Sequence, residues 1–298
     1  MTLDCGYISP ANKSEALRLL ADGGGAGKLR ICAGGTDLLL RIRSKKEEGT
    51  AIVDIANLGL DYIHEDAELI RIGAMASLTS VERFFSGQNQ PLCLLSVSAG
   101  AVGCWQTRGL ATLAGNVCTG LPSADAAVAL LAVEAKVKLE SVNGERVVPI
   151  EEFFVKPRTL ALHTGEMVTE LLVPKRSVAA GQRFGSDFIK IGRRKELFIS
   201  VLSVACVLLL ESDGAIAEAR LAGGVLAPIP IRLYKTEEFL AGKKVTEDVL
   251  AAAADVMQGD VTARDSLRGS RRYRENAGAA IMRRVVHNSV NHAMEVCV

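Results

Sequence analysis

The sequence lacks the cysteine pairs and histidine clusters that mark metal-binding and disulfide-rich proteins. Its seven cysteines include no Cys-x-x-Cys pair, which argues against a zinc ribbon, a resident iron–sulfur cluster or a disulfide framework. The four histidines are scattered, and the five-residue spacing of His287 and His292 suits shared ligation on a helix poorly. We therefore expect no metal site here, so that the metal centres of any redox chemistry would lie in other chains.

The sequence also lacks a long apolar run and a strong net charge. Its longest apolar stretch, about residues 199–210, is interrupted by Ser200 and Ser203 and is well short of the ~20 residues of a membrane-spanning helix. The first residues show no basic segment followed by an apolar one, so no signal peptide is expected. A net charge of +1 gives no overall field that would attract nucleic acid. We expect a cytoplasmic protein with no membrane span and no nucleic-acid partner.

The local patterns predict a mixed fold in which strands and helices first alternate and then separate. The 298 residues suit one large domain or two to three small ones, and the small, polar stretch 175–182 is the candidate boundary. The apolar periodicities predict strands near 29–32, 51–55, 69–73, 136–139, 146–149, 166–173, 184–191, 200–210 and 215–223. They predict helices near 14–21, 37–43, 77–85, 91–101, 127–132, 232–240, 246–257 and 271–296. This order favours an α+β fold with an antiparallel sheet and helices at the C-terminal end.

Two glycine-bearing segments carry the strongest functional signal. The first is Cys32-Ala33-Gly34-Gly35-Thr36-Asp37, and the second is Ala111-Thr112-Leu113-Ala114-Gly115-Asn116. Residues without bulky side chains let backbone N–H groups approach a phosphate closely. Each segment is predicted to follow a strand. Either one alone could be an ordinary turn, but together they suggest a cofactor with two phosphates and a polyol arm.

A series of further motifs, in this order and spacing, resembles a known family. The motifs are Ala33 to Asp37, Val53-Asp54-Ile55, Arg71-Ile72-Gly73-Ala74, Gln106 to Asn116 with Pro122 and Asp125, Phe188 to Arg194, Gly223 to Arg232, and Asp265 to Arg274. Along nearly its whole length the chain is similar to the FAD-binding medium subunit of molybdenum hydroxylases. That group includes xanthine dehydrogenase and carbon monoxide dehydrogenase.

The resemblance implies a fold and a set of FAD-binding residues. It implies a two-subdomain FAD-binding module of the PCMH/vanillyl-alcohol-oxidase type over 1–176, divided into about 1–57 and 58–176, and a C-terminal flavoprotein domain over 183–290. The cofactor's pyrophosphate would be wrapped by backbone groups of Arg30, Ile31, Cys32, Ala33, Gly34, Gly35, Thr36 and Asp37. The cradle would be completed by Ala111, Thr112, Leu113, Ala114, Gly115 and Asn116, with Thr112 and Asn116 donating side-chain hydrogen bonds.

The resemblance also implies residues around the flavin itself. Asp125 would accept hydrogen bonds from a hydroxyl of the flavin chain, and Met167 and Ile189 would pack against the flavin region. Lys190 would place a cation there and raise the reduction potential. The chain departs from the family pattern at Ala114, which replaces a glycine. If the backbone there has positive φ, alanine strains it by ~1 kcal/mol or more.

The implied function is electron transfer within a larger enzyme, with no catalytic side chain in this subunit. A large molybdopterin-binding subunit would oxidise the substrate, and a small [2Fe–2S] subunit would pass electrons to FAD here. NAD or another acceptor would then receive them, and the assembly would be a dimer of heterotrimers. Two alternatives stay open: a stand-alone FAD oxidoreductase, and a subunit that has lost flavin.

Overall fold

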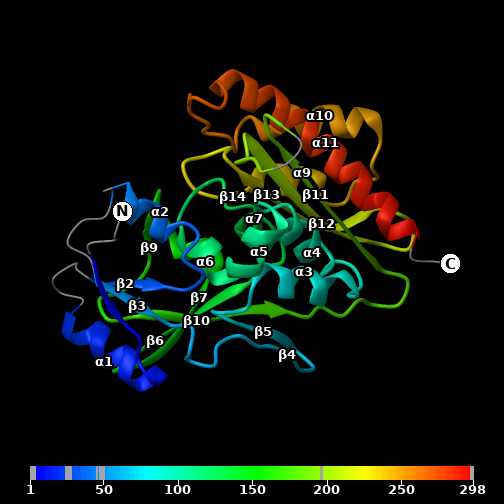
Figure 1. The fold of residues 1–298 in the computed structure, drawn as a ribbon. Helices are drawn as coiled ribbons and strands as arrows, with labels where there is room; N and C mark the ends of the chain where they lie inside the picture. Colours follow the sequence, from blue (N-terminus) through cyan, green and yellow to red (C-terminus); the bar gives the residue numbers. More distant parts are fainter. Residues whose placement is uncertain (1–4, 24–28, 45, 47–50, 195–196, 296–298) are drawn as a thin grey trace.

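The computed structural model describes residues 5–23, 29–44, 46, 51–194 and 197–295 (Figure 1). The chain begins with a small parallel sheet of order β1–β3–β2, with strands β1 (Gly6–Ile8), β2 (Leu29–Cys32) and β3 (Ala51–Asp54). Helix α1 (Lys13–Gly23) and helix α2 (Leu38–Arg43) form its connections. The predicted strand–helix–strand unit is confirmed, and the parallel strands end at one edge.

A five-stranded antiparallel sheet follows, of order β4–β5–β10–β6–β7. Its strands are β4 (Ile63–Glu65), β5 (Leu69–Gly73), β10 (Met167–Pro174), β6 (Lys136–Ser141) and β7 (Gly144–Pro149). The predicted hairpin is confirmed, since Ser141 pairs with Gly144 and Gly144 has a φ of 126°. Glycine takes that conformation at little cost, which fixes the turn.

Short helices occupy the space between this sheet and the C-terminal part. They are α3 (Leu78–Ser86), α4 (Leu94–Gly100), α5 (Trp105–Leu110), α6 (Leu113–Cys118), α7 (Asp125–Ala132) and α8 (Ile150–Phe153), with a small hairpin of β8 (Phe154–Lys156) and β9 (Thr159–Leu160). All eight residues of α7 are buried. Its sequence, Asp followed by only Ala, Val and Leu, is apolar on every face, which is typical of a helix enclosed on all sides.

The C-terminal part is an antiparallel sheet of order β11–β12–β13–β14 covered by helices. Its strands are β11 (Arg183–Ile191), β12 (Leu202–Leu210), β13 (Ile216–Gly224) and β14 (Ile231–Arg232), and its helices are α9 (Tyr234–Leu240), α10 (Glu247–Met257) and α11 (Arg271–Glu295). The α+β prediction is confirmed, although the last residue of the predicted C-terminal helix, 296, lies outside the described residues.

The central strand of this sheet is buried on both faces. Ala205 and Val207 pack into the core that contains α7, whereas Cys206 and Leu208 pack into a second core beneath α11. This explains why the sequence there is a continuous apolar run rather than an alternation. The sheet is therefore held between α7 on one side and α9 and α11 on the other, and α10 packs against these two helices (Figure 1).

Candidate functional site

The first glycine segment forms the turn that leaves β2 and enters α2. Gly35 has a φ of 69°, in the left-handed region that glycine favours. Within the described part of the chain, no acceptor takes a hydrogen bond from the N–H of Gly34, Gly35 or Thr36. Neighbouring unpaired N–H donors of this kind are what a phosphate group requires.

A cavity of about 480 Å³ opens beside this turn. It is lined by Cys32, Gly34 and Gly35 of the first segment and by Tyr7 and Asp54 of the adjacent strands, among other residues. It extends along the parallel strands, from Tyr7 and Ile52 within β1 and β3 to the first segment at the carboxyl end of β2.

The second glycine segment differs from the prediction in its local structure. It follows helix α5 rather than a strand, so the prediction of a strand before it is wrong. Thr112 caps helix α6, because its Oγ1 accepts a hydrogen bond of 2.9 Å from the N–H of Gly115. Ala114 lies inside α6 and is absent from the positions with positive φ among the described residues. The strain considered for alanine at this position therefore does not arise.

The two segments, far apart in sequence, are in direct contact. A methyl group built on Gly34 would lie 1.8 Å from the carbonyl oxygen of Leu110 and 3.0 Å from the Cα of Ala111. Only glycine allows the two backbones to come this close. The side-chain Oδ1 of Asn116 is buried and has no hydrogen-bond partner in the described structure. The unpaired backbone N–H groups of the first segment fit a phosphate, whereas the unpaired amide oxygen of Asn116 is an acceptor and fits a hydrogen-bond donor of a ligand.

A buried ion pair lies beyond the second segment. The Lys190 Nζ is 2.6 Å from Asp125 Oδ2, and the two side chains are 6% and 4% exposed. The ammonium also donates to the carbonyl oxygen of Ala101 at 2.7 Å and lies 4.4 Å from the ring centre of Phe198. Ser200 donates to Asp125 Oδ1. Burial raises the pKa of Asp125, and the neighbouring Lys190 opposes that rise.

This pair joins two parts of the chain, because Asp125 begins α7 and Lys190 lies on β11. The carboxylate predicted to accept from a flavin hydroxyl already accepts from Lys190 and Ser200. Each carboxylate oxygen has two lone pairs, so further hydrogen bonds remain available. Ser203, paired with Lys190 in the sheet, has a buried Oγ without a partner in the described residues.

The remaining predicted site residues each have other contacts. Ile31 and Met167 pack in the core of the N-terminal part, and Ile189 packs toward the second core, on the face of β11 opposite Lys190. Asp37 lies 3.7 Å from Arg41 and 3.8 Å from Arg158. It does not cap α2 with its side chain. The Nη1 of Arg30 donates to the carbonyl oxygen of Leu29.

Several residues that contact Lys190 or Asp125, or that line the cavity, were not predicted from the sequence. Ser200 was noted only as a polar interruption of an apolar stretch, and that interruption was the available signal. Phe198, Ala101 and Tyr7 had no signal. Asp54 belonged to a quoted motif but was assigned no role.

The described residues contain no group of three or more His, Cys, Asp or Glu side chains that could hold a metal ion. Nor do they form any helix long and apolar enough to cross a membrane.

Comparison with protein families and known proteins identifies the chain's relatives. Residues 3–176 match the FAD binding domain in molybdopterin dehydrogenase, and residues 187–289 match the CO dehydrogenase flavoprotein C-terminal domain. The chain is 31% identical over 289 residues to a xanthine dehydrogenase FAD-binding subunit of Escherichia coli, covering 95% of each chain. It is 29% identical over 259 residues to the nicotinate dehydrogenase FAD-subunit of Eubacterium barkeri, covering 86% of each.

A solved structure agrees with these sequence matches. The chain superposes with a TM-score of 0.90 and 27% identity on a chain of carbon monoxide dehydrogenase from Hydrogenophaga pseudoflava, in a form lacking the Mo-pyranopterin moiety. The match covers 98% of this chain and all of that one (100%). The chain belongs to the family of FAD-binding flavoprotein subunits of molybdopterin dehydrogenases, which are oxidoreductases.

Proposed function

We propose that this chain carries electrons within a multisubunit molybdenum hydroxylase, from the [2Fe–2S] clusters of a small partner subunit to an external acceptor such as NAD. A large partner would hold the molybdopterin and the substrate site, and the assembly would be a dimer of heterotrimers. The relative from Hydrogenophaga pseudoflava is named a medium chain, and those from Escherichia coli and Eubacterium barkeri are named FAD subunits. Such names support a role as one chain among several.

The fold supports a division of labour along the chain. We assign FAD binding to residues 1–176, with subdomains of about 1–57 and 58–176, and a covering role to the flavoprotein domain 183–290. The two glycine segments come from different subdomains and meet at Gly34. The Lys190–Asp125 pair comes from both domains.

The assignment of the cofactor site rests on the unpaired N–H groups of Gly34, Gly35 and Thr36. We assign them to the pyrophosphate, to which the side-chain amide of Asn116 would also donate. FAD, when bound, supplies the capacity to accept and release electrons. The residues of the chain bind it, orient it and set its electrostatic surroundings. Lys190, fixed by Asp125 and Ala101, would place an ammonium group in a buried environment, where the Asp125 carboxylate offsets much of its charge.

The contact between the two segments gives a direct test. Gly34→Ala forces a methyl group against the Leu110 carbonyl. Because overpacking of this kind costs about 1–3 kcal/mol, we expect the Kd for FAD to rise by about tenfold or more. Gly109→Ala is the matched control, since a methyl group there meets nothing within 4 Å. The measurement is FAD retention and Kd, followed by flavin absorbance and fluorescence.

A second variant separates cofactor binding from folding. The side-chain Oδ1 of Asn116 has no partner in the described structure, so Asn116→Ala removes no hydrogen bond to that oxygen. We expect unchanged or increased thermal stability of the apoprotein and about tenfold weaker FAD binding. Full FAD affinity in both Gly34→Ala and Asn116→Ala would contradict the assignment of the site.

A further inference from the structure

The first glycine segment has a carboxylate on each side. Asp54 is the one charged residue among the described residues that line the adjoining cavity. At the other end of the segment, Asp37 directly follows the three unpaired N–H groups, and its side chain is 43% exposed. A pyrophosphate is itself negatively charged, so two neighbouring carboxylates repel it. The segment therefore needs a nearby cation to accept such a ligand well.

Two arginines approach Asp37. The Nη1 of Arg41, one turn further along α2, is 3.7 Å from Asp37 Oδ2, and the Nη1 of Arg158 is 3.8 Å from the same oxygen. Arg158 comes from the turn between β8 and β9, which lies next to α2 (Figure 1). The Arg158 side chain is 42% exposed, so its guanidinium is accessible to a ligand bound at the first segment.

The backbone of Arg158 has a conformation that arginine rarely adopts. Its φ is 61°, in the left-handed region that is unfavourable for residues with a Cβ. It follows Pro157 in the turn that joins Lys156 to Thr159. Proline followed by a residue with positive φ is the pattern of a type II turn, which favours glycine or asparagine at the second position. The turn alone does not explain an arginine here, and strained residues of this kind cluster at binding sites.

Backbone contacts just beyond the second glycine segment hold this residue in place. The N–H of Arg158 donates to the carbonyl oxygen of Gly120 at 2.8 Å, and Gly120 lies two residues after the end of α6. Gly120 has a φ of 60°, and a methyl group built on it would lie 2.9 Å from the Cα of Arg158. Arg158 thus has its backbone fixed beside α6 and its side chain beside the first segment, so it connects the two.

From this arrangement we propose that Arg158 is a phosphate-binding residue, which offsets the charge of Asp37 and binds the pyrophosphate of the cofactor. The inference rests on the proposed binding of FAD and adds the β8–β9 turn to its site as a third segment. The first segment supplies neutral N–H donors, and Arg158 supplies a charged donor, which binds a phosphate oxygen more strongly. A glycine in the turn would relax the backbone but would lack this charge.

Variants that remove or keep the charge test this role. We expect Arg158→Gln to raise the Kd for FAD by about tenfold, because one charge-assisted contact is lost and Asp37 is left less compensated. Arg158→Lys should stay within about threefold of the unmodified protein. In the presence of Asp37→Asn, Arg158→Gln should raise the Kd by a smaller factor. The measurement is equilibrium titration of the apoprotein by flavin fluorescence, in which added salt should reduce the effect of Arg158→Gln.

A third substitution separates binding from folding. Arg158→Gly removes the guanidinium and also relaxes the left-handed backbone. We expect the apoprotein to keep or raise its Tm while its Kd for FAD rises about as much as that of Arg158→Gln. Arg271→Gln is the matched control, because it removes the same charge from an ion pair with Glu275 on α11, at 2.6 Å. Its Kd for FAD should equal that of the unmodified protein.

The outcomes distinguish this role from FAD binding itself. Unchanged FAD affinity in Arg158→Gln, or equal weakening by Arg271→Gln, would overturn the assignment of Arg158 while leaving FAD binding intact. A fall in the Tm of Arg158→Gly alongside its loss of affinity would also overturn the assignment, since the residue would then be structural. An unmodified protein that does not bind FAD would overturn the proposed function as well.

Discussion

At the scale of single residues, the Lys190–Asp125 pair is the contact whose loss should lower the stability of the fold most. Both side chains are almost fully buried, and removal of one partner from a buried ion pair costs about 3–5 kcal/mol. We expect Lys190→Met and Asp125→Asn each to lower the free energy of unfolding by this amount. The free energy of unfolding of the double variant should fall by less than the sum of the two single losses, since no uncompensated charge is left. Denaturant unfolding of the four proteins measures the coupling.

The same pair gives a pH dependence with a definite sign. Burial raises the pKa of Asp125 from 3.8 in the native state, so its protonated form favours folding and that contribution is lost as the pH rises through the native pKa. Lys190→Met removes the group that opposes this rise. We expect the loss of stability of Lys190→Met, relative to the unmodified protein, to shrink as the pH falls from 7 toward 4. A deficit that stays constant over this range would mean that Asp125 is not the group left uncompensated.

At the scale of helices and strands, the sequence predicts what local patterns determine and misses what tertiary contacts determine. The hairpin at Gly144 and the buried strand β12 follow from a turn signal and an apolar run. Helices α5 and α6 have six residues each, too few for a periodic pattern. Their place is set by distant backbone contacts, in which Leu78 donates to the Ala111 carbonyl and Leu113 to that of Ala76. No local signal could reveal those contacts.

The predictions of the site residues also divide into those that local sequence explains and those that depend on tertiary structure. The glycine segments were found because close backbone approach restricts residue type, as at Gly34. Asp125 and Lys190 were found through a family resemblance and not from local chemistry. Ile189 was assigned to the flavin region with Lys190, but adjacent strand residues point to opposite faces. Tyr7 was missed because a three-residue strand paired to a distant one leaves no pattern.

An acid-sensitive contact joins Arg146 of strand β7 to Glu166, the residue before strand β10. Glu166 accepts from Arg146 Nε at 2.6 Å and Nη2 at 2.7 Å, and these bonds lower its pKa below 4.5. A lowered native pKa stabilises the fold above 4.5, and this contribution is lost as the pH falls below it. We expect Glu166→Gln to be less stable by about 1–2 kcal/mol at pH 7, and this deficit to disappear as the pH falls through the native pKa of Glu166.

Acid unfolding followed by circular dichroism measures this difference. Glu145→Gln on the same hairpin is the control, because that side chain is largely exposed and pairs with Lys138 at the surface. Its effect should stay below about 1 kcal/mol at any pH. Equal pH profiles for the two variants would show that the Arg146 contact has no special role.

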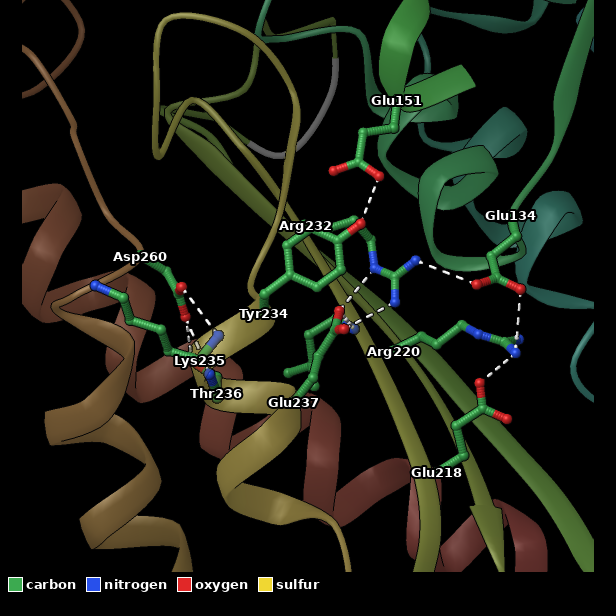
Figure 2. Close-up of polar contacts among 11 residues, drawn as sticks. Glu134, Glu151, Glu218, Arg220, Arg232, Tyr234, Lys235, Thr236, Glu237 and Asp260 are labelled. Carbon is green, nitrogen blue, oxygen red and sulfur yellow. Dashed lines mark hydrogen bonds and ion pairs between the residues drawn. The ribbon is translucent and has the colours of Figure 1, made fainter. Parts of the chain in front are cut away.

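At the scale of the whole molecule, helix α7 ties the N-terminal part to the C-terminal sheet at both of its ends. At its start, Asp125 binds Lys190. Just beyond its end, Glu134 lies 3.1 Å from Arg220 and 3.6 Å from Arg232, which come from β13 and β14 (Figure 2). Arg232 is in turn held by the buried Glu237 at 2.7 Å. Between these contacts α7 is enclosed by both parts of the chain, so neither part can unfold without exposing it.

This arrangement predicts one cooperative unfolding transition, which two cysteines can report. Cys118 lies at the end of α6 and Cys206 in the middle of β12. Burial raises the pKa of both thiols to about 12, so both should resist alkylation in the native protein. We expect them to become reactive at the same urea concentration in a pulsed-labelling series read by mass spectrometry. Labelling of one thiol well before the other would instead show that the two parts unfold separately. Glu134→Gln should move both midpoints together and by a small amount, since that carboxylate is 47% exposed.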